Sequence, residues 1–194
     1  KPFVFIMLYI GKLTSESAVN RAIDAGRFGL RNPHVGLIIL GDGPAKKMFE
    51  KRAEILGIKE QVVFESDVKD IVPYLKSANV LIIPDTNAES EEVALKGAAA
   101  GIPMVLSRTP VREDIFTDGE SALFCAPDNI DEFSLKLNIL MNDVPLRNHM
   151  VQLAQEMIMA KFHEDPNKYL TAYRESLEQV LFIENSEDVN SEKK

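Results

Sequence analysis

The sequence contains a single cysteine, Cys125, among its 194 residues. One cysteine cannot form an internal disulfide bond, and no group of residues has the spacing of zinc ligands. Basic residues are also in the minority, with 22 Lys and Arg against 30 Asp and Glu, which argues against a broad basic surface for nucleic acid. The longest apolar run covers residues 3–10, whereas a membrane-spanning helix needs about 20 apolar residues. We therefore expect no transmembrane segment in this chain and no nucleic acid among its partners.

Short apolar runs rich in Val, Ile and Phe alternate with amphipathic segments of helical length. The composition, 45% hydrophobic and 27% charged, is that of a globular chain with one sizeable core. The runs are nearly continuous in hydrophobicity, as is typical of parallel strands covered on both faces. They cover residues 3–10, 35–40, 62–64, 80–83, 104–106 and 123–125. This alternation predicts an α/β fold with a doubly wound, Rossmann-like parallel sheet of about six strands.

Residues with known preferences for helix ends mark the segments between these runs. We expect Thr14 and Ser15 to cap a helix that continues through Ile23, and Ser90 to cap a helix over residues 91–100. Pro44 predicts the first turn of a helix over residues 45–56, which Gly57 ends.

The pattern changes after Pro127, where no further strand is predicted. Residues 130–141, 145–161 and 166–182 have the pattern of three helices, and the polar segment 183–194 has the composition of a disordered tail. The predicted organisation is one domain over residues 1–182, in which residues 130–182 form a C-terminal helical extension. Because the chain starts at Lys1 and enters a strand at once, we interpret it as a piece of a longer protein.

Ligands of open α/β sheets bind at the carboxyl ends of the strands. The Gly-Asp-Gly-Pro turn at residues 41–44 follows one such strand, but no Gly-Lys-Ser/Thr follows it, so it is not a P-loop. The first strand is followed by "GKLTSES" rather than by a dinucleotide-binding fingerprint. The fold alone therefore leaves two interpretations open, a nucleotide or phosphate site at this edge, and glycines that only form turns.

Five stretches of the chain carry a resemblance to a known family, and they occur in that family's order. They are "YIGKLTSESAV", "LIILGDGPAKKMFEKRAEILGI", "VVFESDVKDIVPYLKSANVLIIPD", "GIPMVLSRTPVREDIFTDGESALFCAPDNIDEFS" and "KFHEDPNKYLTAYRESL". Over about residues 3–180 the chain resembles the C-terminal, donor-binding domain of glycosyltransferases of the GT-B fold, in the family 4-like group 1. The resemblance implies that the chain forms one half of a GT-B fold.

The resemblance also implies a function. In that family the domain binds a nucleotide-diphosphate sugar, and a retaining enzyme transfers the hexose to an acceptor on a separate N-terminal domain, which is missing here. The acceptor would be a glycan, a lipid or a small molecule. No cofactor or divalent metal is implied, because protein cations and helix ends support the leaving group in such enzymes. We expect the fragment alone to be inactive. The implied location is the cytoplasm, with peripheral membrane attachment as an option for the full-length protein.

The family's motifs assign candidate residues by position. Its Arg after the first strand falls at Lys12, its base-contacting segment falls at Val68, and its Pro-Glu falls at Glu113. The first Glu of its Glu-x7-Glu motif falls at Ala88 or Glu89. The candidate donor-binding residues are therefore Gly11, Lys12, Val68, Glu89 and Glu113, with no catalytic residue and no metal ligand assigned.

Other positions depart from the family's pattern. Ser17 stands where the second phosphate-binding cation belongs, Lys96 stands where the second Glu belongs, and "ESEE" at residues 89–92 replaces the glycine-rich loop. These carboxylates satisfy the helix dipole themselves and would repel phosphates. The departures favour an alternative hypothesis, a catalytically degenerate GT-B-like domain that acts as a binding or scaffolding module.

Three side chains have two interpretations each. Lys96 either pairs with Glu92 one helical turn earlier or takes a new ligand role. Glu113 either approaches the diphosphate or simply opens a helix over residues 113–116. Arg108 either replaces the lost cation or is a solvated surface residue. Cys125 is most simply explained as a small buried apolar residue.

Overall fold

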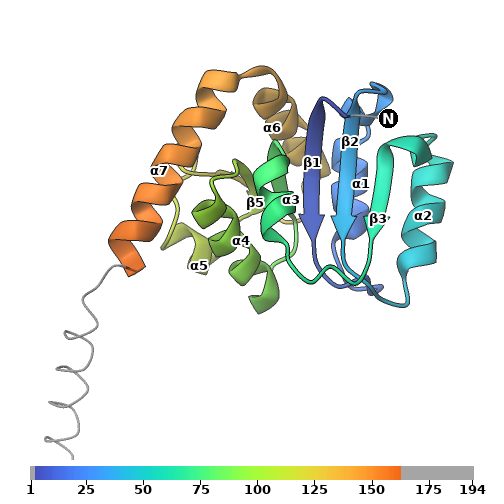
Figure 1. Cartoon of the computed structure of the whole chain (residues 1–194), viewed down its shortest axis with the longest axis horizontal. Helices are drawn as coiled ribbons and strands as arrows, with labels where there is room; N and C mark the ends of the chain where they lie inside the picture. The colour runs from blue at the N-terminus through green and yellow to red at the C-terminus, as the bar shows by residue number, and fades with distance from the viewer. Residues whose placement is uncertain (1–2, 163–194) are drawn as a thin grey trace, which may run out of the picture. The chain divides into compact units, whose positions relative to one another are not determined.

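The computed structural model describes residues 3–162 of the chain (Figure 1). The chain divides into two compact units between Ile158 and Met159, and the description that follows concerns the first. The helix predicted over residues 166–182 and the tail predicted over residues 183–194 lie outside the described residues.

Six strands form one sheet, in which every pairing between strands is parallel. The strands are β1 (Phe5–Ile10), β2 (Val35–Leu40), β3 (Val62–Glu65), β4 (Val80–Ile83), β5 (Met104–Ser107) and β6 (Leu123–Cys125). Their order across the sheet is β3-β2-β1-β4-β5-β6, so β1 lies between β2 and β4. Met7 of β1 is in register with Leu37 on one side and with Val80 on the other. This order confirms the predicted Rossmann-like fold and puts the topological switch point between β1 and β4.

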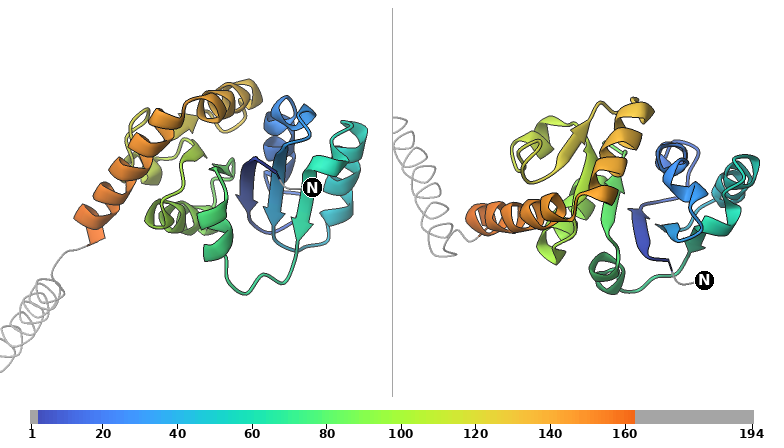
Figure 2. Two further views of the ribbon diagram at one scale, coloured as in Figure 1. Left: turned by 45° about the horizontal axis from the view of Figure 1, so that its top comes forward. Right: turned by 90° about the horizontal axis from the view of Figure 1, so that it is seen from above.

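Helices cover both faces of the sheet (Figure 2). They are α1 (Val19–Gly26), α2 (Lys46–Ile55), α3 (Val72–Ser77), α4 (Ala88–Ala100), α5 (Pro110–Glu113), α6 (Ile130–Asn142) and α7 (Val144–Phe162), with short 3-10 turns at Gly29–Arg31 and Lys59–Gln61. Buried residues of α1, α2 and α6 pack with one face of the strands, and those of α3 and α4 pack with the other. Residues of α7 reach both clusters, through Met150 and Ala154. The alternation of inward side chains along the strands produces these two cores.

Two helices begin at residues other than those predicted. Helix α1 starts at Val19 rather than near Thr14 and Ser15, and the carboxylate of Asp85 accepts the Ala18 N–H at 2.8 Å. The cap therefore comes from the loop after β4, which no local pattern indicates. Helix α4 starts at Ala88, because the side chain of Asn87 accepts the Ser90 N–H at 2.9 Å. Ser90 is thus inside the first turn of α4 and is not its cap.

The short helix before the last strand also differs from the prediction. Helix α5 begins at Pro110, and Thr109 caps it by accepting the Arg112 N–H. Glu113 is the last residue of α5 rather than the first residue of a helix over 113–116. The Thr-Pro pair, a capping residue followed by proline in the first turn, fixes this start.

The single cysteine is buried in the core. Cys125 ends β6 with no exposed surface, and burial raises the pKa of its thiol to about 12. A thiol in this state is neither a nucleophile nor a metal ligand at neutral pH. The interpretation of Cys125 as a small apolar core residue is confirmed.

Candidate functional site

A cleft of about 900 Å³ opens where β1, β2 and β4 end. Its walls come from the segment after β1, the turn after β2, the segment before α3 and the first turns of α4. Side chains and backbone that line it include Gly11, Lys12, Ser17, Gly41, Asp67, Val68, Asp85, Glu89, Glu92 and Lys96. Since the cleft adjoins the ends of β1 and β4, it lies at the topological switch point, where α/β sheets of this order bind their ligands.

Four of the five candidate residues predicted from the sequence line this one cleft. Gly11 and Lys12 follow β1, Val68 follows β3, and Glu89 lies in the first turn of α4. Glu113 does not line the cleft, and its carboxylate is paired with Arg108 instead. The fold thus brings Lys12 and Glu89 together, although they are 77 positions apart in the sequence.

One wall of the cleft is built from backbone that glycine allows to approach closely. The Gly11 N–H donates to Leu40 O at 3.0 Å, and the Leu13 N–H donates to Asp42 O at 2.9 Å. Gly41 has a φ of +151°, and a Cβ atom there would lie 1.9 Å from Gly11 O. The glycine of the Gly-Asp-Gly-Pro turn is therefore required by its contact with the segment after β1.

Each of the three glutamates at the start of α4 has its own cation. Glu89 pairs with Lys12 across the cleft. Glu92 pairs with Lys96 at 2.7 Å, and this hydrogen bond lowers the pKa of Glu92. Glu91 turns away from the cleft and binds Arg112. The predicted pairing of Lys96 with Glu92 is confirmed, and the carboxylates that would repel a phosphate are each partly neutralised.

Arg112 is a fully buried cation that sequence reasoning missed. Its guanidinium donates to Glu91 Oε2, to Ser90 Oγ and to the backbone oxygen of Ser107, each at 2.8 Å, and to the oxygen of Ile83 at 3.4 Å. Burial lowers the pKa of Arg112, and the charge of Glu91 opposes that shift. The side chain joins the ends of β4 and β5 to the first turn of α4. Its partner Glu91 is 21 residues away, so no helical or strand spacing reveals the pair.

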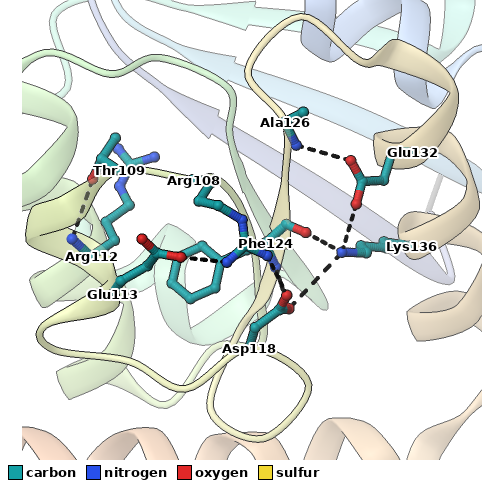
Figure 3. A network of polar contacts seen from close by, with 9 residues as sticks. All are labelled: Arg108, Thr109, Arg112, Glu113, Asp118, Phe124, Ala126, Glu132 and Lys136. Carbon is teal, nitrogen blue, oxygen red and sulfur yellow. Dashed lines mark hydrogen bonds and ion pairs between the residues drawn. The ribbon is translucent and has the colours of Figure 1, made fainter.

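A second polar network lies at the ends of β5 and β6 (Figure 3). Arg108 pairs with Glu113 and Asp118, and its guanidinium carbon lies 5.3 Å from the centre of the Phe124 ring. Lys136 of α6 donates to the backbone oxygen of Phe124 and pairs with Glu132 at 3.0 Å. The interpretation of Arg108 as a surface residue is confirmed, since its side chain is 43% exposed, although two carboxylates pair with it. It does not line the cleft, so it does not replace the lost cation there.

Two buried polar residues close the inner end of the cleft. Tyr9 is 1% exposed and Asp85 is 8% exposed. The pKa of Tyr9 is raised, first by burial and then by the charge of Asp85. Asp85 in turn fixes the start of α1 through Ala18. Neither residue was predicted, because each lies at the end of an apolar strand where a turn residue is also expected.

The lining of the cleft has an excess of negative charge. Two lysines, Lys12 and Lys96, face six carboxylates, which are Glu16, Asp42, Asp67, Asp85, Glu89 and Glu92. Within residues 3–162, no group of three or more His, Cys, Asp or Glu side chains is placed to hold a metal ion. In the same residues no helix combines the length and the apolar character that crossing a membrane requires.

A doubly wound sheet with a cleft at its switch point is the architecture in which open α/β domains bind their ligands. The sequence model of one family, described as "Glycosyl transferases group 1", matches residues 4–157. The chain belongs to the group 1 glycosyltransferases, and its fold is that of the C-terminal domain of a GT-B enzyme.

Curated relatives agree with this assignment. Over 162 residues the chain is 28% identical to the uncharacterized glycosyltransferase MJ1607 of Methanocaldococcus jannaschii, covering 82% of the chain and 42% of the relative. Over 160 residues it is 24% identical to the lipopolysaccharide core biosynthesis glycosyltransferase LpsE of Rhizobium meliloti, covering 82% of the chain and 46% of the relative. The chain spans less than half the length of these relatives.

Solved structures share the fold at low sequence identity. The C-terminal domain of a group 1 family protein, LpcC from Francisella tularensis, matches with a TM-score of 0.74 and 17% identity, over 84% of this chain and 89% of that one. Anabaena Alr3699/HepE, in complex with UDP and glucose, matches with a TM-score of 0.77 and 19% identity, over 90% of this chain and 48% of that one.

Proposed function

We propose that this chain is the donor-binding domain of a retaining glycosyltransferase and binds a nucleoside-diphosphate sugar in the cleft beside β1 and β4. The observation that carries the proposal is the gathering of Gly11, Lys12, Val68 and Glu89 from three separate segments at the switch point. The solved relative HepE holds UDP and glucose, which gives the ligand class. Nothing in the comparisons favours the alternative of a degenerate scaffolding module.

The cleft has the size and the mixture of groups that such a ligand needs. Its volume of about 900 Å³ lies within the range of small-molecule sites. Lys12 is the cation proposed for the diphosphate, and Val68 with Ile71 gives apolar surface for the base. Gly11 has no side chain to separate its backbone from the ligand, and a Cβ atom there would lie 2.9 Å from the Tyr9 hydroxyl. We assign no ligand contact to Glu113, which is bound to Arg108.

The chemistry proposed for the whole enzyme follows from this arrangement. The hexose would pass to a glycan, lipid or small molecule held by a further domain, and Lys12 would neutralise part of the charge on the leaving diphosphate. We propose no metal ion and no cofactor for this step, and a location in the cytoplasm or at the membrane surface. Alone, the chain is expected to bind the donor without transferring the sugar.

Calorimetric titration of the 194-residue chain with UDP, GDP and ADP tests the proposal. We expect one of the three to bind, which also identifies the base. Lys12→Ala is expected to weaken that binding at least about tenfold, because a charged contact to the phosphates is lost.

Lys51→Ala is the matched control, since it removes the same charge from the exposed face of α2, outside the cleft lining. Equal affinity of the Lys12→Ala variant and the unsubstituted chain would contradict the role of Lys12. The absence of heat with all three nucleotides would contradict donor binding itself.

A further inference from the structure

The cation proposed for the diphosphate already has an anionic partner within the chain. The Lys12 ammonium pairs with Glu89 across the cleft, from the segment after β1 to the first turn of α4. Both side chains remain largely exposed, at 72% and 58%, so a ligand can reach them. Any phosphate that binds Lys12 therefore competes with a carboxylate for the same ammonium group.

The position of Glu89 is fixed by its neighbours on α4. Asn87, two residues before Glu89, caps the helix by accepting the Ser90 N–H at 2.9 Å. Arg112 then binds Ser90 Oγ and Glu91 Oε2, each at 2.8 Å, from the buried side of the same turn. With Ser90 and Glu91 held against the sheet, the first turn presents Glu89 to the cleft. The Lys12 pair is thus a consequence of how α4 is anchored.

The remaining charges of the cleft do not supply a substitute cation. Lys96, the other lysine among the lining residues, pairs with Glu92 one turn away. Four further carboxylates line the same cleft, namely those of Glu16, Asp42, Asp67 and Asp85. A diphosphate that enters therefore competes with Glu89 for Lys12 and finds no unpaired lysine among the lining residues.

We propose that Glu89 is an internal competitor for Lys12, which lowers the affinity of the cleft for the diphosphate group and speeds release of the nucleoside-diphosphate product. This inference rests on the proposed function. When the donor binds, its diphosphate displaces the carboxylate of Glu89 from Lys12; after transfer, Glu89 returns to Lys12 as the product departs. Product release limits the turnover of many enzymes, so a residue that weakens product binding raises the rate of the cycle.

Glu89→Gln removes the competing charge and keeps the size of the side chain. The affinity for the nucleoside diphosphate is expected to rise about three- to fivefold, the change that loss of one exposed ion pair allows. Most of this change is expected in a slower dissociation rate, measured by stopped-flow displacement of the bound nucleotide. The corresponding nucleoside, which has no phosphate, is expected to bind both proteins equally.

Two further comparisons separate competition for Lys12 from a general change in charge. Glu92→Gln removes the same charge from the same helical turn, but its partner is Lys96, so the affinity is expected to change less than about twofold. In a Lys12→Ala background, Glu89→Gln is expected to leave the nucleotide affinity unchanged, because the lysine for which Glu89 competes is absent. Equal effects of the two glutamine variants, or an undiminished effect without Lys12, would overturn the inference.

Inorganic pyrophosphate, titrated into the same proteins, distinguishes a failure of this inference from a failure of the proposed function. Suppose that none of the proteins binds a nucleotide, but that the Glu89→Gln variant binds pyrophosphate more tightly than the unsubstituted chain. This result would support the role of Glu89 as a competitor and contradict the proposed nucleotide site. If the Glu89→Gln variant binds the nucleotide with the same affinity as the unsubstituted chain, Glu89 does not compete for Lys12, and the proposed function is unaffected. If neither pyrophosphate nor nucleotide binds any of the proteins, both proposals are wrong.

Discussion

Replacing Arg112 with methionine is expected to lower the free energy of unfolding by about 3–5 kcal/mol, the range measured when one partner of a buried ion pair is removed. Arg112 has no exposed surface, and its guanidinium binds Glu91, Ser90 and the backbone oxygen of Ser107. Methionine fills much of the volume but donates no hydrogen bond. Glu91, whose side chain is 18% exposed, would keep its charge and its hydrogen bond from Thr109 but lose the cation that pairs with it.

Arg108→Met is the matched control for this prediction, measured by urea denaturation under the same conditions. Arg108 has two carboxylate partners where Arg112 has one, but the side chain of Arg108 is 43% exposed. Its loss is therefore expected to cost about 1 kcal/mol or less, as for other solvent-exposed pairs. If the two variants unfold at the same urea concentration, Arg112 does not anchor the first turn of α4 as described.

Gly41→Ala has the second largest expected effect, and it affects the cleft directly. A Cβ atom at position 41 would lie 1.9 Å from Gly11 O. No side-chain rotation can relieve this contact, because the backbone fixes the position of Cβ and Gly11 O is itself a backbone atom. The segment that carries Gly11 and Lys12 must therefore move. We expect a loss of about 2–3 kcal/mol in stability, from strain and overpacking together. The affinity for the nucleoside diphosphate is expected to fall more than about tenfold, because moving binding groups by about 1 Å is enough to disrupt a preorganised site.

Gly57→Ala separates backbone strain from the steric clash. Gly57 has a φ of +71° at the end of α2, and no atom lies within 4 Å of a Cβ atom built there. This variant is expected to lose about 1–2 kcal/mol from the left-handed conformation alone, with nucleotide affinity unchanged. An affinity loss shared by both alanine variants would mean that general destabilisation, rather than the contact of Gly41 with Gly11, is the cause.

The strands were predictable because local sequence determines them. Continuous Val- and Ile-rich runs between turn residues have few alternative secondary structures, and β2, β4 and β6 have the predicted bounds. Helix starts were less predictable, because several neighbouring residues are able to cap. In "TNAES" before α4 both Asn87 and Ser90 are good caps, and the structure uses Asn87. For α1 the partner is Asp85, 67 residues from Ala18, which local sequence does not specify.

The candidate site also has features that could be predicted from the sequence and features that depend on tertiary packing. The choice of Lys12, Val68 and Glu89 came from the family resemblance, and the parallel sheet explains why they gather, since its strands bring their carboxyl ends to one edge. The pair of Lys96 with Glu92 followed from helical spacing. The pairs of Lys12 with Glu89 and of Arg112 with Glu91 depend on tertiary packing, with separations of 77 and 21 residues.

Mapping of the bound nucleotide by NMR tests the central claim most directly. In the uniformly 15N-labelled chain, saturation with the nucleoside diphosphate that binds in calorimetry is expected to shift the backbone amide signals of Gly11, Lys12, Val68 and Glu89. Those of Gly26 and Asn138, which line a separate cleft of about 490 Å³ between α1 and α6, are expected to stay in place. Shifts centred on Gly26 and Asn138, or no shifts at the ends of β1 and β4, would contradict the assignment of the donor site.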